Sequence, residues 1–245
     1  MTHSSTQKKP GPRILEVAGL VLALMLTIAV PARAVIVANG NFEADSVTDI
    51  PEGASATATS WTIGPGGPFA SAALYDPTGS IRFPADPAYA GENNAAVVYT
   101  NGGFFRQLLG ITLASNTRYR LTVDVGNDAI GGGFPTVING VSGDARARLL
   151  VNGATSPMPG LVSSTAATPP VGNFNTWTLV WETGWNEPLL GSDLTFDLSR
   201  GATGGNTWFD NVTLTAELIP EPSTVLLLGL GGLFAWRKTR RLTQR

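Results

Sequence analysis

Residues 118–125 alternate strictly between polar and apolar side chains, and this period of two constrains the fold more than any other feature. Tyr119, Leu121, Val123 and Val125 fall on one side of an extended segment, and the residues between them are polar. Successive side chains of a β-strand point to opposite faces, so we predict a strand with one buried face. Residues 177–181 repeat the pattern with two tryptophans and a leucine.

Short segments of this kind recur along the chain, and residues 35–219 show no sustained period of 3.6. Glycine and asparagine between them supply the positive φ angles of tight turns. The predicted strands cover residues 60–63, 70–75, 95–100, 104–109, 118–125, 146–151, 176–182, 194–199 and 208–216. This pattern predicts an all-β, two-sheet β-sandwich with a jelly-roll topology, and an immunoglobulin-like Greek key is the alternative. Residues 128–143 and 155–172 are predicted to be surface loops.

The first 34 residues have the composition of a secretory signal peptide. A basic start at residues 8–13 precedes an apolar helical run at residues 17–30, and small residues around Ala34 form a cleavage pattern. We therefore expect export through the secretion translocon and removal of residues 1–34 by signal peptidase, with Val35 as the new N-terminus. An uncleaved signal anchor is the alternative.

The last 27 residues combine a proline-bracketed acid, a short apolar run and a basic end. The 12 residues 225–236 would form a helix of roughly 18 Å, shorter than the roughly 30 Å hydrocarbon layer of a membrane. Trp236 and the long basic side chains extend the usable length. A permanent C-terminal transmembrane helix is one interpretation, and a transient one is the other. The membrane-stop basic cluster comprises Arg237, Lys238, Arg240 and Arg241.

This order of motif, leucine- and glycine-rich run and basic end resembles the PEP-CTERM sorting signal of exopolysaccharide-producing Gram-negative bacteria. The same tail is also labelled the ice-binding protein C-terminal domain. The resemblance implies recognition by an exosortase-type membrane enzyme that cleaves close to the motif and passes the ectodomain outward. The predicted domains are therefore residues 1–34, the ectodomain 35–218 and the tail 219–245. The sorting motif consists of Pro220, Glu221, Pro222 and Ser223.

The charge of the ectodomain and its missing residue types exclude several classes of function. Residues 43–221 hold 17 acidic residues against seven arginines and no lysine, which disfavours binding to nucleic acid. The chain has no cysteine, and its single histidine, His3, lies in the signal peptide. Catalytic triads with histidine, cysteine nucleophiles and histidine-bound zinc are therefore excluded from the ectodomain. No carboxylate pair stands out as a glycosidase site. We predict that the protein is not an enzyme.

The two ends of the ectodomain resemble the first and last strands of carbohydrate-binding jelly rolls with a galactose-binding-like fold. The similar stretches are residues 39–43, followed by Trp61, and residues 208–214. The resemblance implies a structural calcium, with Glu43 and Asp210 as ligands beside backbone carbonyls. Calcium takes six to eight oxygen ligands, and a cation would relieve the repulsion between two carboxylates. The alternative is that Asp210 caps a turn and Glu43 is solvated.

Loop aromatic residues are the candidates for sugar contact, because carbohydrate sites stack aromatic rings on sugar faces. The possible glycan contacts are Trp61, Tyr75 and Trp185; as the alternative, these rings fold back as lids. Trp177, Trp181 and Trp208 are predicted to be core residues. An arginine-rich sheet face could bind acidic polysaccharide, but pairing with Asp124, Glu182 and Asp197 is the simpler explanation. That face comprises Arg106, Arg118, Arg120, Arg146 and Arg148.

These features together predict an exported protein of the cell surface or extracellular matrix of a Gram-negative bacterium, held at the inner membrane until sorting. We expect a non-catalytic structural or adhesive role linked to exopolysaccharide. The alternative is a carbohydrate-binding module for a surface or environmental polysaccharide. The expected partners are an exosortase-type enzyme, the secretion machinery, the membrane and exopolysaccharide, and the only expected cofactor is structural calcium.

Overall fold

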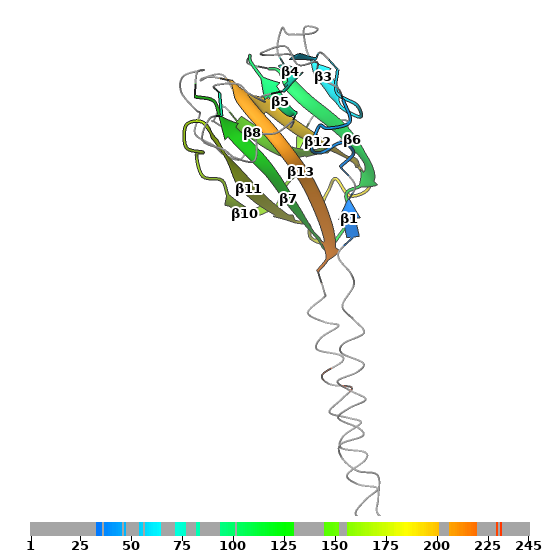
Figure 1. Cartoon of the computed structure of the whole chain (residues 1–245). Helices are drawn as coiled ribbons and strands as arrows, with labels where there is room; N and C mark the ends of the chain where they lie inside the picture. The colour runs from blue at the N-terminus through cyan, green and yellow to red at the C-terminus, as the bar shows by residue number, and fades with distance from the viewer. Residues whose placement is uncertain are drawn as a thin grey trace, which may run out of the picture. The chain divides into compact units, whose positions relative to one another are not determined.

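The computed structural model describes 13 strands in two antiparallel sheets that face each other (Figure 1). The described residues are 33–35, 37–45, 47, 54–55, 57–64, 72–76, 82–83, 94–100, 102–129, 145–151, 156–200, 206–219, 229 and 231. The chain divides into two units, and residues Ala32–Glu217 form the unit that contains nearly all of the described strands. The fold below is that of this unit.

The larger sheet has eight strands and the smaller sheet has five. The larger follows the order β10 (Leu161–Thr165), β11 (Asn173–Glu182), β7 (Thr117–Asn127), β13 (Thr207–Leu218), β5 (Ala95–Val98), β4 (Ala72–Tyr75) and β2 (Ala54–Ser55), with β1 (Arg33–Val35) paired to β13. The smaller follows β3 (Thr62–Gly64), β6 (Phe104–Thr112), β12 (Asp193–Arg200), β8 (Ala145–Val151) and β9 (Ser156–Pro157). The expected all-β, two-sheet architecture is confirmed.

The main core lies between the two sheets and is built by the predicted alternation. Tyr119, Leu121, Val123 and Val125 on β7 are all buried, and the residues between them are exposed or half-buried. The buried side chains of β12 and β8 face them from the smaller sheet, with Phe196 and Leu149 among the largest. A continuous apolar layer of this kind supplies most of the folding free energy of a domain without disulfides.

A second, smaller core covers the opposite face of β4, β5 and β13. Alternate residues of these strands belong to different clusters, so Phe209 faces the main core and Trp208 faces the other way. Tyr75 and Phe83 pack edge-on against the Trp208 ring at centroid distances of 5.0 and 5.1 Å. The predicted burial of Trp208 is therefore confirmed, but the ring belongs to this outer cluster, because Thr207 and Phe209 take the inward positions.

Each predicted strand overlaps a strand of the structure. The prediction of a surface loop at residues 155–172 is wrong. That segment contains β9 and β10. Its serines, threonines and prolines hide the pattern, since β10 lies at a sheet edge with mostly exposed or half-buried side chains. Most of the other predicted loop, 128–143, lies outside the described residues. So do residues 1–32 of the signal peptide and nearly all of the C-terminal segment.

Candidate functional site

The start and the end of the ectodomain meet at one corner of the sandwich. The turn at residues 39–45 contacts β13 through a hydrogen bond of 2.8 Å from the Val212 N–H to the Gly40 carbonyl. A Cβ atom on Gly40 would lie 2.3 Å from the Val212 carbonyl oxygen, so only glycine permits this approach. Asn39 and Phe42 adopt positive φ angles of 50° and 58°, which turn the chain sharply beside the last strand.

The two carboxylates predicted to bind calcium both belong to this corner. Asp210 is only 2% exposed, and its Oδ1 accepts the Asn211 N–H at 2.7 Å. Glu43 is exposed, and its Oε1 accepts the Asn94 N–H at 2.6 Å. The Asn94 side chain also donates to the Phe42 carbonyl at 3.2 Å. A buried carboxylate suits a hard cation, because a bound cation offsets the cost of burying the charge.

Further protein carboxylates for this cation are missing from the described part of the chain. No three His, Asp or Glu side chains gather closely enough there to hold a metal ion. Asp45 is committed elsewhere, because its carboxylate accepts the Thr59 N–H at 2.8 Å and the Asn39 side-chain amide at 2.9 Å. Calcium at this corner would therefore take most of its oxygens from the backbone and from water.

The three candidate glycan contacts differ sharply in exposure. Trp61 is buried and packs against Phe42 and Phe196, while its indole N–H donates to the Asn39 carbonyl at 3.0 Å. Tyr75 is buried in the outer cluster. Trp185, in contrast, is 54% exposed in the turn after β11. Among these three rings, only that of Trp185 offers a face to a sugar.

The arginines expected on one sheet face lie on two different sheets. Arg118 and Arg120 project from β7 in the larger sheet, and Arg106, Arg146 and Arg148 belong to β6 and β8 in the smaller sheet. The expected pairing of Arg118 with Glu182 is present at 2.6 Å. Asp124 makes no ion pair with another described residue; its carboxylate instead accepts hydrogen bonds from Thr176 and Asn211. The prediction of a single arginine face is therefore wrong.

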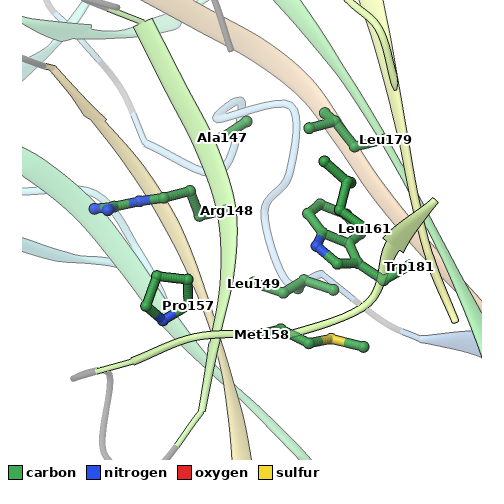
Figure 2. A pocket seen from close by; sticks show the side chains of 8 residues that line it. All are labelled: Ala147, Arg148, Leu149, Pro157, Met158, Leu161, Leu179 and Trp181. Carbon is green, nitrogen blue, oxygen red and sulfur yellow. The ribbon is translucent and has the colours of Figure 1, made fainter. Parts of the chain in front are cut away.

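A pocket of about 170 Å³ lies between β8 and β9 of the smaller sheet and β10 and β11 of the larger one. In Figure 2, Leu161, Leu179 and Trp181 stand opposite Leu149 and Met158, and the Arg148 side chain points away from them. The described lining holds no carboxylate or imidazole. The volume is below the roughly 300–1,000 Å³ of pockets that take drug-sized ligands. Sequence reasoning missed it, because Met158 and Leu161 fall in the segment predicted to be a loop.

The predicted sorting motif and basic cluster lie outside the described residues. Within the described part of the chain, no helix has the length and apolar character that crossing a membrane requires.

The C-terminal tail and the sandwich together define a class of protein. Residues 218–241 match the PEP-CTERM protein-sorting motif, which implies that the chain is exported and is processed by an exosortase. Ahead of the motif stands a two-sheet β-sandwich ectodomain, so this is a surface protein sorted by its tail. Residues 33–215 match the family described as HpiC1 cyclase, and the chain belongs to this HpiC1-like family.

Solved structures with a similar fold include cyclases of Fischerella sp. TAU. The Stig cyclase FisC, in complex with (3Z)-3-(1-methyl-2-pyrrolidinylidene)-3H-indole, is 24% identical, with a TM-score of 0.61 over 78% of this chain and 100% of that one. Another cyclase structure from this organism is 25% identical, with a TM-score of 0.59 and the same coverage. A CBM4 structure is a more distant neighbour, with 16% identity, a TM-score of 0.39, and coverage of 74% and 100%. No curated protein matches the sequence significantly.

Proposed function

We propose that the protein is a non-catalytic structural or adhesive component of the cell surface or extracellular matrix, linked to exopolysaccharide. One observation carries the proposal: a β-sandwich of the HpiC1-like family lies directly ahead of a PEP-CTERM sorting motif. A tail of this kind serves delivery of the domain to the outside. A jelly-roll topology fits the way the chain passes between the sheets after β2, β3, β5, β6, β7, β9, β11 and β12.

The environment of the described acidic residues supports a non-catalytic role. General acid catalysis needs a carboxyl group that can reach the substrate and exchange a proton. Asp197 is fully buried between two arginines, and Glu182 is paired with Arg118. The carboxylate of Asp124 accepts two side-chain hydrogen bonds. Each of these groups therefore has a structural role in the folded domain.

Mass spectrometry of the protein from its own host tests the sorting part of the proposal. We expect a mature chain that begins at Val35 and ends near residues 220–222, recovered with the exopolysaccharide fraction. Replacing Glu221 with Gln should leave precursor in the membrane fraction, and replacing Glu217 with Gln outside the motif should not. An extracellular product that still carries Trp236, or protein found in the cytosol, would contradict the proposal.

Calcium at the corner formed by the first turn and β13 is part of the same proposal. The buried Asp210 carboxylate would hold the ion together with Glu43, and the ion would offset the unfavourable burial of the charge. A chelator should then lower the Tm of the full chain, and Asp210→Asn should remove that sensitivity. Asp193→Asn, at an exposed strand end, is the matched control. If the chelator leaves the Tm unchanged, no calcium binds at this corner.

The exposure of Trp185 favours a second candidate, a carbohydrate-binding module. A flat indole face in an exposed turn suits stacking on a sugar ring. A glycan array should then show binding that Trp185→Ala removes. Val171→Ala is a matched control, because Val171 is an apolar side chain with 65% exposure and no aromatic face. If no glycan binds, the structural role is the one that remains.

A cyclase reaction is the rival that the family description raises. The inter-sheet pocket is the place to test it, because its described lining is apolar apart from Arg148. We expect no saturable binding of 4-(1H-indol-3-yl)butan-2-one, a compound found in complex with a Fischerella cyclase. Should it bind, Ala147→Leu would tell whether the pocket is responsible, because the larger side chain narrows the space between the sheets. Turnover of an indole substrate would contradict the non-catalytic proposal.

A further inference from the structure

Part of the outer face of the smaller sheet holds more arginines than acidic residues, counted over the residues that the structure describes. The strand register places Arg106 of β6 and Arg148 of β8 on either side of Asp197 of β12. In the next row, Ser199 stands between Phe104 and Arg146. Directly paired residues share a face of the sheet, so these two rows form one patch of three arginines and one aspartate. We call it the arginine patch.

Both oxygens of the Asp197 carboxylate accept hydrogen bonds from the two arginines beside it. Its Oδ1 accepts the Arg106 Nε–H at 2.6 Å, and its Oδ2 accepts two bonds from Arg148, at 3.0 Å from Nε and 2.7 Å from Nη2. The Ser199 hydroxyl donates to the same Oδ2 at 2.7 Å. The Asp197 side chain is fully buried, while those of Arg106 and Arg148 remain 31% and 20% exposed. The carboxylate therefore fixes both guanidinium groups and leaves part of each open to solvent.

Arg146 has no partner at all among the described residues. Its Nε is buried without a hydrogen bond, and Arg146 makes no ion pair there. A buried donor left unsatisfied is unfavourable, and a missing water or ligand is one explanation for such a group. Among the described residues, three arginines against one aspartate leave a surplus of two positive charges on the patch. This surplus lies in an ectodomain whose sequence has ten more acidic than basic residues between positions 43 and 221.

The larger sheet shows what a purely structural arginine looks like in this protein. Arg118 on β7 meets two carboxylates, Glu182 at 2.6 Å and Glu217 at 3.1 Å. That cation is more than balanced by its own neighbours, and its side chain is well exposed. The arginine patch has the opposite balance, because there one carboxylate serves two cations and a third cation has none.

Apolar groups next to the arginine patch complete a surface that suits a charged sugar. The Arg106 guanidinium lies 3.9 Å from the centre of the Phe104 ring. In the row on the other side of Arg106, Leu108 is 65% exposed. A guanidinium group binds a carboxylate through paired hydrogen bonds, and neighbouring apolar side chains can contact the C–H face of a sugar ring.

We propose that the arginine patch binds an acidic polysaccharide through its carboxylate groups, that is, a chain of uronate residues. Arg146 supplies the free guanidinium, and Arg106 and Arg148 are positioned by Asp197 to present their remaining N–H groups. Phe104 and Leu108 contact the ring between successive carboxylates. This inference rests on the proposed association with exopolysaccharide and names the chemistry that the surface would recognise.

Binding of polygalacturonate to the full-length chain in detergent tests the proposal, with dextran as the neutral control. We expect saturable binding to polygalacturonate that weakens as salt rises, and none to dextran. Arg146→Gln should weaken binding roughly tenfold, because it removes charge-assisted hydrogen bonds to the ligand. Arg120→Gln, which removes an exposed arginine of the larger sheet, should change the affinity less than twofold. Unchanged Tm values would show that both variants fold.

Three results would overturn the proposal. One is no binding to polygalacturonate at low salt. Another is an equal loss in the Arg146→Gln and Arg120→Gln variants, which would mean that overall charge decides. The third is equal binding to polyglutamate, which would mean that the patch recognises charge without sugar. If instead Arg146→Gln abolishes polygalacturonate binding while the protein still fractionates with host exopolysaccharide, the patch is real but another surface anchors the domain. If wild-type protein does not fractionate with host exopolysaccharide, the proposed function is contradicted. Binding of polygalacturonate by the arginine patch would be unaffected by that result.

Discussion

Asp197 is an acidic residue whose environment makes it essential to the fold. Its carboxylate is fully buried and joins β12 to β6 on one side and to β8 on the other. Removing one member of a buried ion pair is strongly destabilising, because the charges that remain lose their compensation. The three central strands of the smaller sheet are thus tied together by one side chain.

Asp197→Asn should lower the free energy of unfolding by about 3 kcal/mol, the lower end of the range for buried pairs. The lower end applies because both arginines are partly exposed and water can reach them. Glu182→Gln, which breaks a partly exposed ion pair with Arg118, should change the free energy of unfolding by less than about 1 kcal/mol. Urea denaturation measures both. Equal losses in the two variants would mean that the carboxylate of Asp197 is solvated like that of Glu182.

Tyr119 should give stability a dependence on alkaline pH. Burial raises the pKa of its hydroxyl, and the N–H donated by Ala114 at 2.8 Å opposes this only in part. Above the ordinary tyrosine pKa of about 10, the unfolded chain releases a proton that the folded chain keeps, so the folded state binds more protons and stability falls as pH rises. Below that pH the full contribution is present.

Tyr119→Phe tests this, because phenylalanine does not titrate. At neutral pH the variant should be less stable by about 1–3 kcal/mol, since the Ala114 N–H loses its acceptor. The difference between wild type and variant should narrow as the pH passes about 10. Denaturation curves at a series of pH values measure it, and a constant difference across that range would contradict the assignment.

The burial of a side chain was predicted correctly where it follows from the alternation within one strand. It was predicted wrongly where it depends on contacts with a distant part of the chain. The inward positions of β7 and of Trp177 and Trp181 follow from the period of two. Trp61 and Tyr75 lie close to stretches with glycine and proline, at residues 64–68 and 77–79, which predicts a position in or beside a loop. Their burial depends on Phe42 and Phe83, which are distant in sequence, and no local pattern reveals such contacts.

At the scale of elements, the turn at residues 39–45 depends on its contact with β13. Gly40→Ala places a methyl group against the Val212 backbone carbonyl, which cannot move without shifting the strand. We expect a loss of about 1–3 kcal/mol in the free energy of unfolding, typical of overpacking. Gly184→Ala is the control, because the nearest atom to its Cβ is the Glu187 Oε1 at 3.8 Å, and it should cost no more than about 0.5 kcal/mol. An unaffected Gly40→Ala variant would mean that the turn separates freely from the strand.

The element prediction was better for central strands than for edges. Strands such as β7 and β11 pair on both sides and bury one face, so their sequences carry a clear pattern. β10 pairs only with β11, and its fit depends on Gly160, where a Cβ would lie 2.2 Å from the Glu182 carbonyl oxygen. A single glycine in a polar stretch looks like a loop. For this reason the pocket beside β10 could not be predicted from the sequence.

At the scale of the whole sandwich, one core links the two sheets. Leu198 of β12 and Leu121 of β7 are fully buried members of the same cluster. Leu198→Ala should therefore lower the free energy of unfolding by about 2–5 kcal/mol without splitting the transition. Far-ultraviolet circular dichroism and tryptophan fluorescence should give coincident curves. Two separate transitions would mean that the sheets unfold independently.

The fold class and the export of the chain were predictable from sequence, whereas the arginine patch was not. The alternation in residues 118–125 and the order of motif, apolar run and basic end in residues 219–245 each lie within one short stretch. Both can therefore be recognised without knowing what the rest of the chain contacts. The patch needs the register of β6, β12 and β8, which are joined by distant parts of the chain. Without that register, Arg146 looked like one of five similar arginines, and its missing partner was invisible.

The short strand β1 crosses the point at which the sequence predicts signal cleavage. Arg33 and Ala34 pair with Ala216 and Thr215 of β13, and only Val35 would remain after a cut behind Ala34. The secreted form would then differ from its precursor in the few residues just ahead of the sorting motif, where backbone groups would lose their partners. Signal cleavage would thereby free one edge of β13 at Thr215 and Ala216, a few residues ahead of the sorting motif in the sequence.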